Sequence, residues 1–179
     1  MGKKNGSRAI ASDVELIVAM NQEVFGWRPA WLDPPKRYAQ ATEAVAGSAK
    51  SAAIIRKTVL IVDDDILVVP ALFRLLYRDF NIIAANSGHH ALEILASVSS
   101  VSALMTDLRM PNMDGLQVLT AAKEFYPSMP RILFTGDPNR ELIGAALRIG
   151  VLGVLYKPLD AAEVGQFLQL AVSDHWDAV

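Results

Sequence analysis

The stretch Ala103-Leu-Met-Thr-Asp107-Leu-Arg-Met-Pro-Asn-Met-Asp-Gly-Leu-Gln-Val-Leu119 decides the fold. A short apolar run ends in the carboxylate Asp107, a loop containing Pro, Asn and Gly follows, and a new periodic apolar segment then begins. This order predicts a strand, a loop and a helix. In open α/β sheets, functional groups collect just beyond the carboxyl ends of the strands. We therefore expect Asp107 at a functional edge, although a lone Asp can also be a helix cap or a solvated loop acid.

On both sides of this stretch, residues 58–172 alternate short apolar runs with amphipathic segments, which predicts five βα units around a parallel sheet. We expect strands at 58–62, 82–85, 102–106, 131–135 and 151–155. Helices are expected at 66–78, 88–98, 116–125, 139–149 and 160–172. Pro70 should delay the start of the first of these helices or bend it, because proline lacks the backbone N–H.

Polar residues stand where four of the predicted strands end. They are Asp63-Asp64-Asp65 after the first strand, Asp107 at the third, Thr135 at the fourth and Lys157 after the fifth. Because the ends of parallel strands meet at one edge, these groups should converge. Neighbouring carboxylates repel one another unless a cation intervenes, so Asp63, Asp64 and Asp107 predict a hard-cation site that suits Mg²⁺ best. Lys157 and Thr135 could then neutralise a phosphoryl group arriving on Asp107.

With these motifs in this order and spacing, residues 58–172 resemble the receiver domain of bacterial two-component response regulators. The resemblance covers Val62-Asp-Asp-Asp65, the stretch from Asp107 to Gly115, Thr135-Gly136 and Lys157-Pro158. It implies a flavodoxin-like α/β fold, doubly wound around a five-stranded parallel sheet in the order 2-1-3-4-5. It also implies a cis peptide bond between Lys157 and Pro158.

The resemblance further implies a role for each site residue. Asp107 would be the phosphoacceptor, supplied by a sensor histidine kinase or a histidine phosphotransfer protein of a phosphorelay. Asp63 and Asp64 would hold Mg²⁺ together with the backbone carbonyl of Arg109, while Thr135 would be the switch hydroxyl and Lys157 would pair with the phosphate. Such a phosphoprotein switches binding to a downstream protein, whose identity the sequence does not give. It is no enzyme beyond its own phosphorylation and slow dephosphorylation.

Three positions near the site either differ from the family pattern or tune the chemistry of the family. The family usually carries Tyr or Phe three residues before the lysine as a switch residue, where this chain has Val154; its aromatic residue Tyr156 is expected to point to the other face of the strand. In the family, the positions of Arg109 and Asp137 tune hydrolysis of the phosphoryl group. Because they carry opposite charge here, an Arg109–Asp137 clasp across the mouth of the site is one expectation, and two separately solvated side chains are the other.

Composition limits the remaining possibilities. The 179 residues are 52% hydrophobic and carry a net charge of −2, so one globular domain with an appendage is expected. No basic field supports direct DNA binding. No apolar run reaches the roughly 18 residues of a membrane span, so no membrane insertion is expected. The absence of cysteine is compatible with a cytoplasmic location.

The two ends differ from the receiver-like part in composition. Residues 1–57 predict a partly disordered extension with a short helix after Ser12, a Trp27–Trp31 segment among prolines, and an Ala-rich linker. This extension could dock a partner, pack on its own domain, or reflect a start codon placed too early. Residues 173–179 predict a short C-terminal tail. The chain ends about where the last receiver helix should end, so we expect output through surface recognition or through the extension.

Two alternative functions remain open at this point. Asp63-Asp-Asp-Ile66 loosely fits the Asp-x-Asp pattern of haloacid-dehalogenase-like phosphatases, but such an enzyme would leave Asp107 and its loop unexplained. Turnover of small phosphate esters would identify it. A pseudo-receiver that acts as a phosphorylation-independent scaffold is the other alternative, and it is disfavoured because every chemical position is filled.

Overall fold

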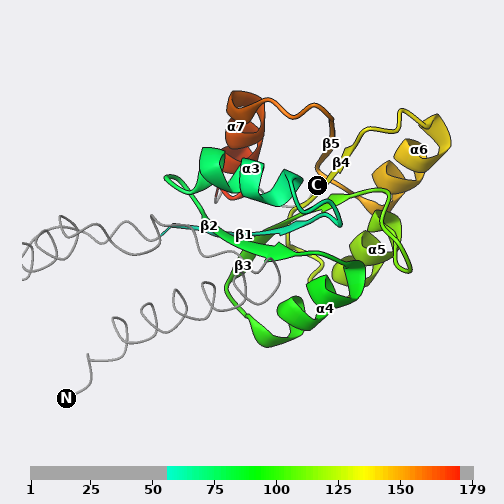
Figure 1. The fold of residues 1–179 in the computed structure, drawn as a ribbon. Helices are drawn as coiled ribbons and strands as arrows, with labels where there is room; N and C mark the ends of the chain where they lie inside the picture. Colours follow the sequence, from blue (N-terminus) through cyan, green and yellow to red (C-terminus); the bar gives the residue numbers. More distant parts are fainter. Residues whose placement is uncertain (1–55, 174–179) are drawn as a thin grey trace, which may run out of the picture. The chain divides into compact units, whose positions relative to one another are not determined.

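The computed structural model describes residues 56–173, and the predictions for residues 1–55 and 174–179 lie outside this range. Within the described residues, five strands and five helices alternate, labelled as in Figure 1. The strands are β1 (Thr58–Val62), β2 (Asn81–Ala85), β3 (Val101–Asp107), β4 (Arg131–Thr135) and β5 (Gly153–Tyr156). The helices are α3 (Val68–Leu76), α4 (Gly88–Ser97), α5 (Gly115–Phe125), α6 (Arg140–Ile149) and α7 (Ala161–Ala171).

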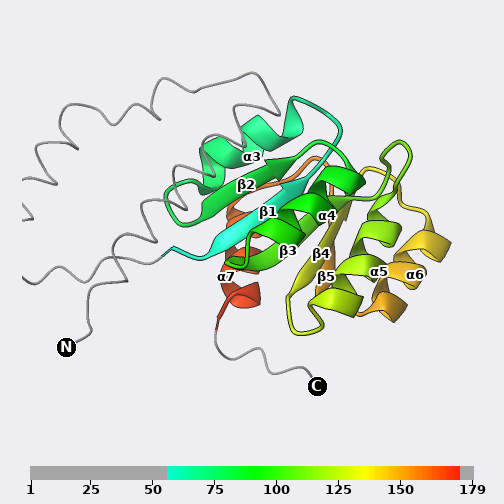
Figure 2. The same cartoon turned by 90° about the horizontal axis from the view of Figure 1, so that it is seen from below.

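All strand pairs are parallel and the strand order is β2-β1-β3-β4-β5, as the sequence predicted. Helices α3 and α7 lie on one face of the sheet, and α4, α5 and α6 lie on the other (Figures 1 and 2). Since both faces are covered, every residue of β1 and of β4 is buried. This explains why these strands read as continuous apolar runs and not as alternating patterns.

Strands β1 and β4 have the predicted boundaries, and the other elements differ from the prediction by one or two residues at one or both ends. Strand β3 extends one residue further at each end, so Asp107 is its last residue. Strand β5 begins at Gly153, because Gly150 ends α6 in the left-handed conformation (φ 90°) and the next two residues return the chain to the sheet. Helix α3 begins at Val68, which places Pro70 in its first turn, where the missing N–H costs no helical hydrogen bond. The predicted delay is confirmed.

The expectation for Tyr156 was wrong. Val154 and Tyr156 are two residues apart on β5 and therefore point to the same face. Leu155, between them, is buried, whereas Val154 is half-buried and Tyr156 is exposed. The aromatic ring thus lies on the same side of β5 as the family's usual switch position, two residues closer to Lys157.

Helices α5 and α6 begin with clear capping signals. Asp114 accepts from the backbone N–H of Gln117, and the Gln117 side chain accepts from that of Asp114, which forms a capping box at the start of α5. Asn139 accepts from the N–H groups of Glu141 and Leu142 at the start of α6. Within residues 56–173, no helix has the length and apolar character needed to span a lipid bilayer.

The buried apolar side chains between the sheet and its helices span residues 59–171. We therefore predict that a variant lacking residues 1–52 still unfolds in one cooperative transition, because residues 59–171 supply apolar side chains to both faces of the sheet. Chemical denaturation followed by circular dichroism, with the full chain as the reference, measures this. An insoluble or molten truncated protein would show that the N-terminal segment belongs to the core.

Candidate functional site

The predicted site residues lie at the carboxyl edge of the sheet. Asp63 directly follows β1, Asp107 ends β3, Thr135 ends β4 and Lys157 directly follows β5. Because β1, β3, β4 and β5 are consecutive in the sheet, their ends bring these side chains to one edge. Asp63, Asp107 and Thr135 are 1%, 4% and 1% exposed, so two carboxyl groups are buried at this edge.

The Lys157 ammonium lies between the two buried carboxylates. Its Nζ atom is 2.8 Å from Asp63 Oδ2 and 2.7 Å from Asp107 Oδ1. The peptide bond between Lys157 and Pro158 is cis, as the resemblance implied. One cation thus offsets two carboxylates that would otherwise repel each other.

The remaining carboxylate oxygens are also paired. Asp107 Oδ2 accepts a hydrogen bond from the backbone N–H of Arg109 at 2.5 Å. Asp63 Oδ1 accepts from the backbone N–H of Asp65 at 2.8 Å. Each of the two buried acids therefore has one oxygen on Lys157 and the other on a loop amide, which fixes its orientation.

Burial and these contacts shift the pKa values of Asp63 and Lys157. Burial raises the pKa of Asp63 above its ordinary value, and the hydrogen bond from Lys157 offsets only part of that effect. Burial alone would lower the pKa of Lys157, but its hydrogen bonds and attraction to Asp107 and Asp63 outweigh this and raise it. The ammonium is therefore charged throughout the neutral range.

The loop between β3 and α5, which we call the acceptor loop because the sequence predicts Asp107 as the phosphoacceptor, folds back tightly on β3. An added Cβ atom at Gly115 would lie only 2.1 Å from the backbone oxygen of Asp107, so only glycine fits there. The N–H of Gly115 donates to the carbonyl of Leu108 at 3.0 Å. Asn112 takes a left-handed conformation (φ 66°), which asparagine tolerates better than most residues. These features hold Asp107 at the start of the α5 connection.

Asp64 does not join the other two acids. Its side chain is exposed, and within residues 56–173 no three acidic or histidine side chains are grouped so that they could hold a metal ion. The donors that the sequence supplies at this edge are nevertheless all oxygens: the carboxylates of Asp63 and Asp107, that of Asp64 on the same turn as Asp63, and the carbonyl of Arg109. Oxygen donors of this kind suit a hard divalent cation, and Lys157 already marks a cation position between two of them. The residues therefore fit Mg²⁺.

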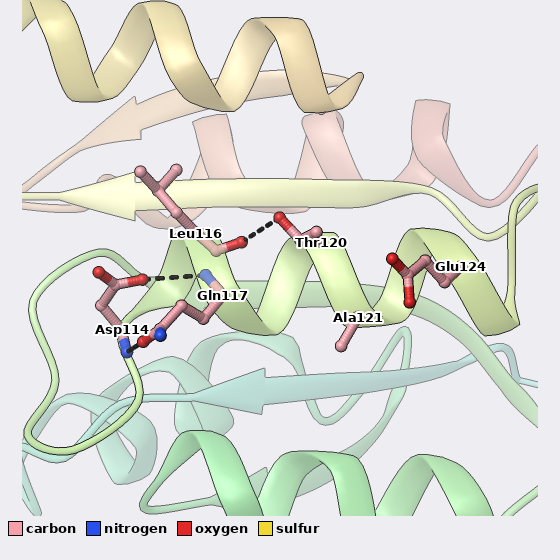
Figure 3. A pocket seen from close by; sticks show the side chains of 6 residues that line it. All are labelled: Asp114, Leu116, Gln117, Thr120, Ala121 and Glu124. Atoms are coloured by element: carbon pink, nitrogen blue, oxygen red, sulfur yellow. Dashed lines mark hydrogen bonds between the residues drawn. The ribbon is translucent and has the colours of Figure 1, made fainter.

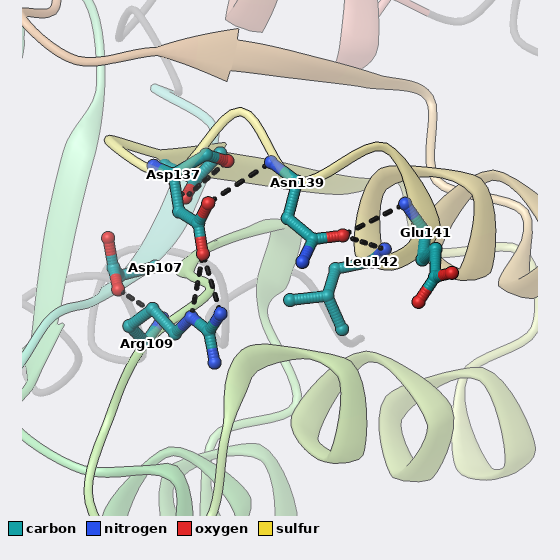
Figure 4. Close-up of polar contacts among 7 residues, drawn as sticks. Asp107, Arg109, Asp137, Asn139, Glu141 and Leu142 are labelled. Carbon is teal, nitrogen blue, oxygen red and sulfur yellow. Dashed lines mark hydrogen bonds and ion pairs between the residues drawn. The ribbon is translucent and has the colours of Figure 1, made fainter.

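Arg109 and Asp137 are in contact across the mouth of the site (Figure 4). The Nε and Nη2 atoms of Arg109 lie 3.0 and 2.6 Å from Asp137 Oδ2. The fork converges on one oxygen, because Asp137 Oδ1 accepts from the backbone N–H of Asn139 at 3.1 Å. The clasp between Arg109 and Asp137 therefore forms, and both guanidinium nitrogens contact the same carboxylate oxygen.

Thr135 faces its own loop. Its Oγ1 accepts from the backbone N–H of Asp137 at 2.9 Å. The hydroxyl is thus engaged by the residue that also holds Arg109. The structure does not pair it with Asp107.

Sequence reasoning missed Phe134. Its ring is fully buried, and the Lys157 ammonium lies over it, 5.1 Å from the ring centroid. The available signal was the position directly before Thr135, which reads only as an apolar core residue.

A shallow hollow of about 470 Å³ runs along the outer surface of α5 (Figure 3). It is lined by Asp114, Leu116, Gln117, Thr120, Ala121 and Glu124. None of the predicted site residues lines it. We assign it no role in the chemistry.

Removing the shared ammonium should destabilise the fold. For Lys157→Met we predict a free energy of unfolding lower by about 2 to 4 kcal/mol at pH 7 without divalent cations, because two buried carboxylates lose their counterion. The raised pKa of Lys157 means that its stabilisation is complete below the ordinary lysine pKa and disappears as pH rises through the raised value.

The stability lost in Lys157→Met should be smaller at acid pH, because Asp63, whose pKa is raised, takes up a proton there and no longer needs a counterion. Urea denaturation at several pH values measures both effects. Lys123→Met, which removes an exposed lysine of α5, is the control and should change stability by less than about 0.5 kcal/mol. Equal stability of Lys157→Met and the parent chain at pH 7 would contradict the prediction.

The comparisons with known proteins agree on one family. The family model described as "Response regulator receiver domain" matches residues 59–169. The DNA-binding transcriptional regulator NtrC of Proteus hauseri is 32% identical over 119 residues, which is 65% of this chain and 25% of the relative. The transcriptional regulatory protein ZraR of Escherichia coli K12 is 34% identical over 116 residues, 64% of this chain and 26% of the relative. The chain thus spans about a quarter of the length of these relatives.

Solved structures show the same fold. The signal receiver domain of an HD domain-containing protein from Pseudomonas fluorescens Pf-5 is 34% identical, with a TM-score of 0.63 over 65% of this chain and 94% of that one. A response regulator receiver domain protein from Clostridium thermocellum is 26% identical, with a TM-score of 0.62 over 64% of this chain and 93% of that one. The likeness therefore covers nearly the whole of each neighbour.

Proposed function

The chain belongs to the response regulator receiver domain family, and from this premise we propose that Asp107 accepts a phosphoryl group and so switches protein binding. The observation that carries the proposal is the Lys157 ammonium 2.7 Å from Asp107 Oδ1, at the end of a strand and beside a second acid. A carboxylate in this position can act as the nucleophile, and the ammonium is already placed where negative charge would develop.

The proposed transfer forms one bond and breaks one. An oxygen of Asp107 attacks phosphorus in line, the acyl phosphate O–P bond forms, and the donor's P–N bond to histidine breaks, with the electron pair leaving on that nitrogen. Lys157 pairs with the phosphoryl oxygens, and the Thr135 hydroxyl turns from Asp137 toward them. Asp63, Asp64, Asp107 and the carbonyl of Arg109 would hold Mg²⁺, which supplies charge neutralisation.

The chain should take its phosphoryl group from a sensor histidine kinase or a histidine phosphotransfer protein. Ile66 and Leu67, directly after the acidic turn, are 68% and 73% exposed. Two large aliphatic side chains beside a buried acid suit contact with a protein donor, because a small phosphodonor has no use for them. The cognate donor and the downstream partner are not given by these features.

The output is proposed to be binding of another protein. NtrC and ZraR are named as a DNA-binding and a transcriptional regulator, but the match covers about a quarter of each. That this chain does not itself bind DNA, and that it works in the cytoplasm, stay predictions. Val154 has no ring to move, so the switch should depend on it less than in relatives with an aromatic residue there.

The phosphatase and scaffold alternatives are less well supported. A haloacid-dehalogenase-like enzyme would have its nucleophile at the end of β1 and would leave Asp107 and the tight loop that Gly115 closes against it without a role. A pure scaffold would not need the ammonium between two acids. Lack of turnover of small phosphate esters would exclude the first, and phosphorylation would exclude the second.

We predict that the chain, given Mg²⁺ and acetyl phosphate, gains one acid-stable and base-labile phosphoryl group, and that Asp107→Asn abolishes it, because an amide is not a nucleophile under these conditions. Intact-mass spectrometry measures the adduct. Asp79→Asn, which alters an exposed acid far from the sheet edge, is the matched control and should be phosphorylated normally. The same adduct on Asp107→Asn would show that another residue is the acceptor.

The clasp should lengthen the life of the phosphoryl group, because it obstructs the approach of water in line with the O–P bond. We predict faster phosphate release from Arg109→Ala and from Asp137→Ala, with the double variant no faster than either, as expected when both remove one interaction. Arg109 is 63% exposed, so the clasp should add only about 0 to 1 kcal/mol to stability.

Release of phosphate from purified phosphoprotein measures the rates. Arg140→Ala, at an exposed arginine at the start of α6, is the control and should release phosphate at the parent rate. Strictly additive effects, or slower release from either single variant, would rule out the clasp as a barrier to water.

A further inference from the structure

The Lys157 ammonium has a third neighbour besides its two carboxylates. The face of the Phe134 ring lies beneath it, 5.1 Å from centroid to Nζ. This is within the range of a cation–π interaction. Phe134 is fully buried as the last residue but one of β4, paired in register with Asp107 on β3 and with Leu155 on β5. The ring is therefore fixed in the sheet, directly beside the acceptor strand.

The two carboxylates cannot keep the ammonium unchanged during the proposed reaction. Asp63 and Asp107 are also the groups that would hold Mg²⁺, and a divalent cation competes with an ammonium for the same oxygens. Asp107 Oδ1 would besides be one of the two oxygens available to attack phosphorus. Of the three partners within reach of Lys157, only the ring is claimed by neither the cation nor the phosphoryl group.

We propose that Phe134 is a positioning residue whose ring face holds the Lys157 ammonium on the acceptor side of the site while Asp63 and Asp107 bind the cation and the phosphoryl group. This inference rests on the proposed function. The ring attracts the ammonium through its quadrupole, and this attraction is strengthened because the ring is out of contact with water. The ammonium then stays above the end of β4, so it is already in position to pair with the phosphoryl oxygens.

Core packing alone would explain an apolar residue at position 134 but not an effect of ring charge. An aliphatic side chain such as leucine would also bury itself between the sheet and its helices. Core packing and attraction of the ammonium by the ring can be distinguished with a ring that keeps its shape but attracts cations less. Successive fluorination does this, because it withdraws charge from the ring face with little change in size.

The first test is a spectroscopic one on the full chain, without phosphodonor. Protons above an aromatic face resonate upfield, so the ε-methylene protons of Lys157 should lie upfield of ordinary lysines in the parent chain and return to the usual range in Phe134→Leu. The upfield position should persist when Mg²⁺ is added. Identical shifts in the parent and in Phe134→Leu, or loss of the upfield shift with Mg²⁺, would overturn the proposal.

The second test is kinetic. Rings carrying one, two and three fluorines are incorporated at Phe134, and phosphorylation is followed over a range of acetyl phosphate concentrations at saturating Mg²⁺. The maximal rate should fall stepwise, by about threefold to tenfold in total, while the concentration giving half the maximal rate changes little. The same series at Phe80, a buried ring that begins the connection into β2, is the control and should leave the rate unchanged.

A rate that is equal across the Phe134 series, or that falls equally in the Phe80 series, would assign Phe134 to packing only. If the parent chain takes up no phosphoryl group at all, the proposed function fails, and the proton shifts still decide whether the ring holds the ammonium. The fluorinated rings also keep the test decisive if Phe134→Leu does not fold.

Discussion

The arrangement at the carboxyl edge depends on one ammonium shared by two buried carboxylates. Without Lys157, Asp63 and Asp107 would face each other as like charges at low exposure, which proteins avoid by protonation or by a bound cation. With Lys157 in place, the two acids share one counterion. The same pairing therefore explains how the folded chain tolerates two buried acids side by side.

The sheet topology makes this pairing possible. Lys157 and Asp63 are 94 residues apart in sequence and meet because β5 and β1 run parallel and end at the same edge. Local features then set the final distances. Gly115 lets the acceptor loop close against the backbone of Asp107, and the amides of Arg109 and Asp65 orient the two carboxylates. The strand order thus brings the charged side chains to one edge, and hydrogen bonds from the loops fix the orientation of their carboxylates.

Most of the fold and of the residue set could be predicted from the sequence because strand ends are marked by polar residues after apolar runs. The pattern located Asp63, Asp107, Thr135 and Lys157 at one edge, and the structure brings them there. It could not show that Phe134 touches the ammonium, since a buried aromatic and a buried aliphatic residue read alike. It also missed Arg131, whose guanidinium is buried against backbone carbonyls of Tyr126, Pro127, Met129 and Gly150, although an arginine normally reads as exposed. The predicted face of Tyr156 was wrong because residues two apart in a strand, such as Val154 and Tyr156, point to the same side.

Chemistry at Asp107 is connected to the start of α6 through Asp137. The backbone N–H of Asp137 donates to Thr135 Oγ1. One of its carboxylate oxygens accepts from Arg109 and the other accepts from the backbone N–H of Asn139, the residue that caps α6 (Figure 4). If the Thr135 hydroxyl turns toward a group on Asp107, the 2.9 Å bond from the N–H of Asp137 must break. A loop held at three points then loses one of them, and the two that remain join the acceptor loop to the helix cap. Each of these bonds is exposed or partly buried and therefore contributes little to stability, so the loop between β4 and α6 is held by several weak contacts and not by one strong one.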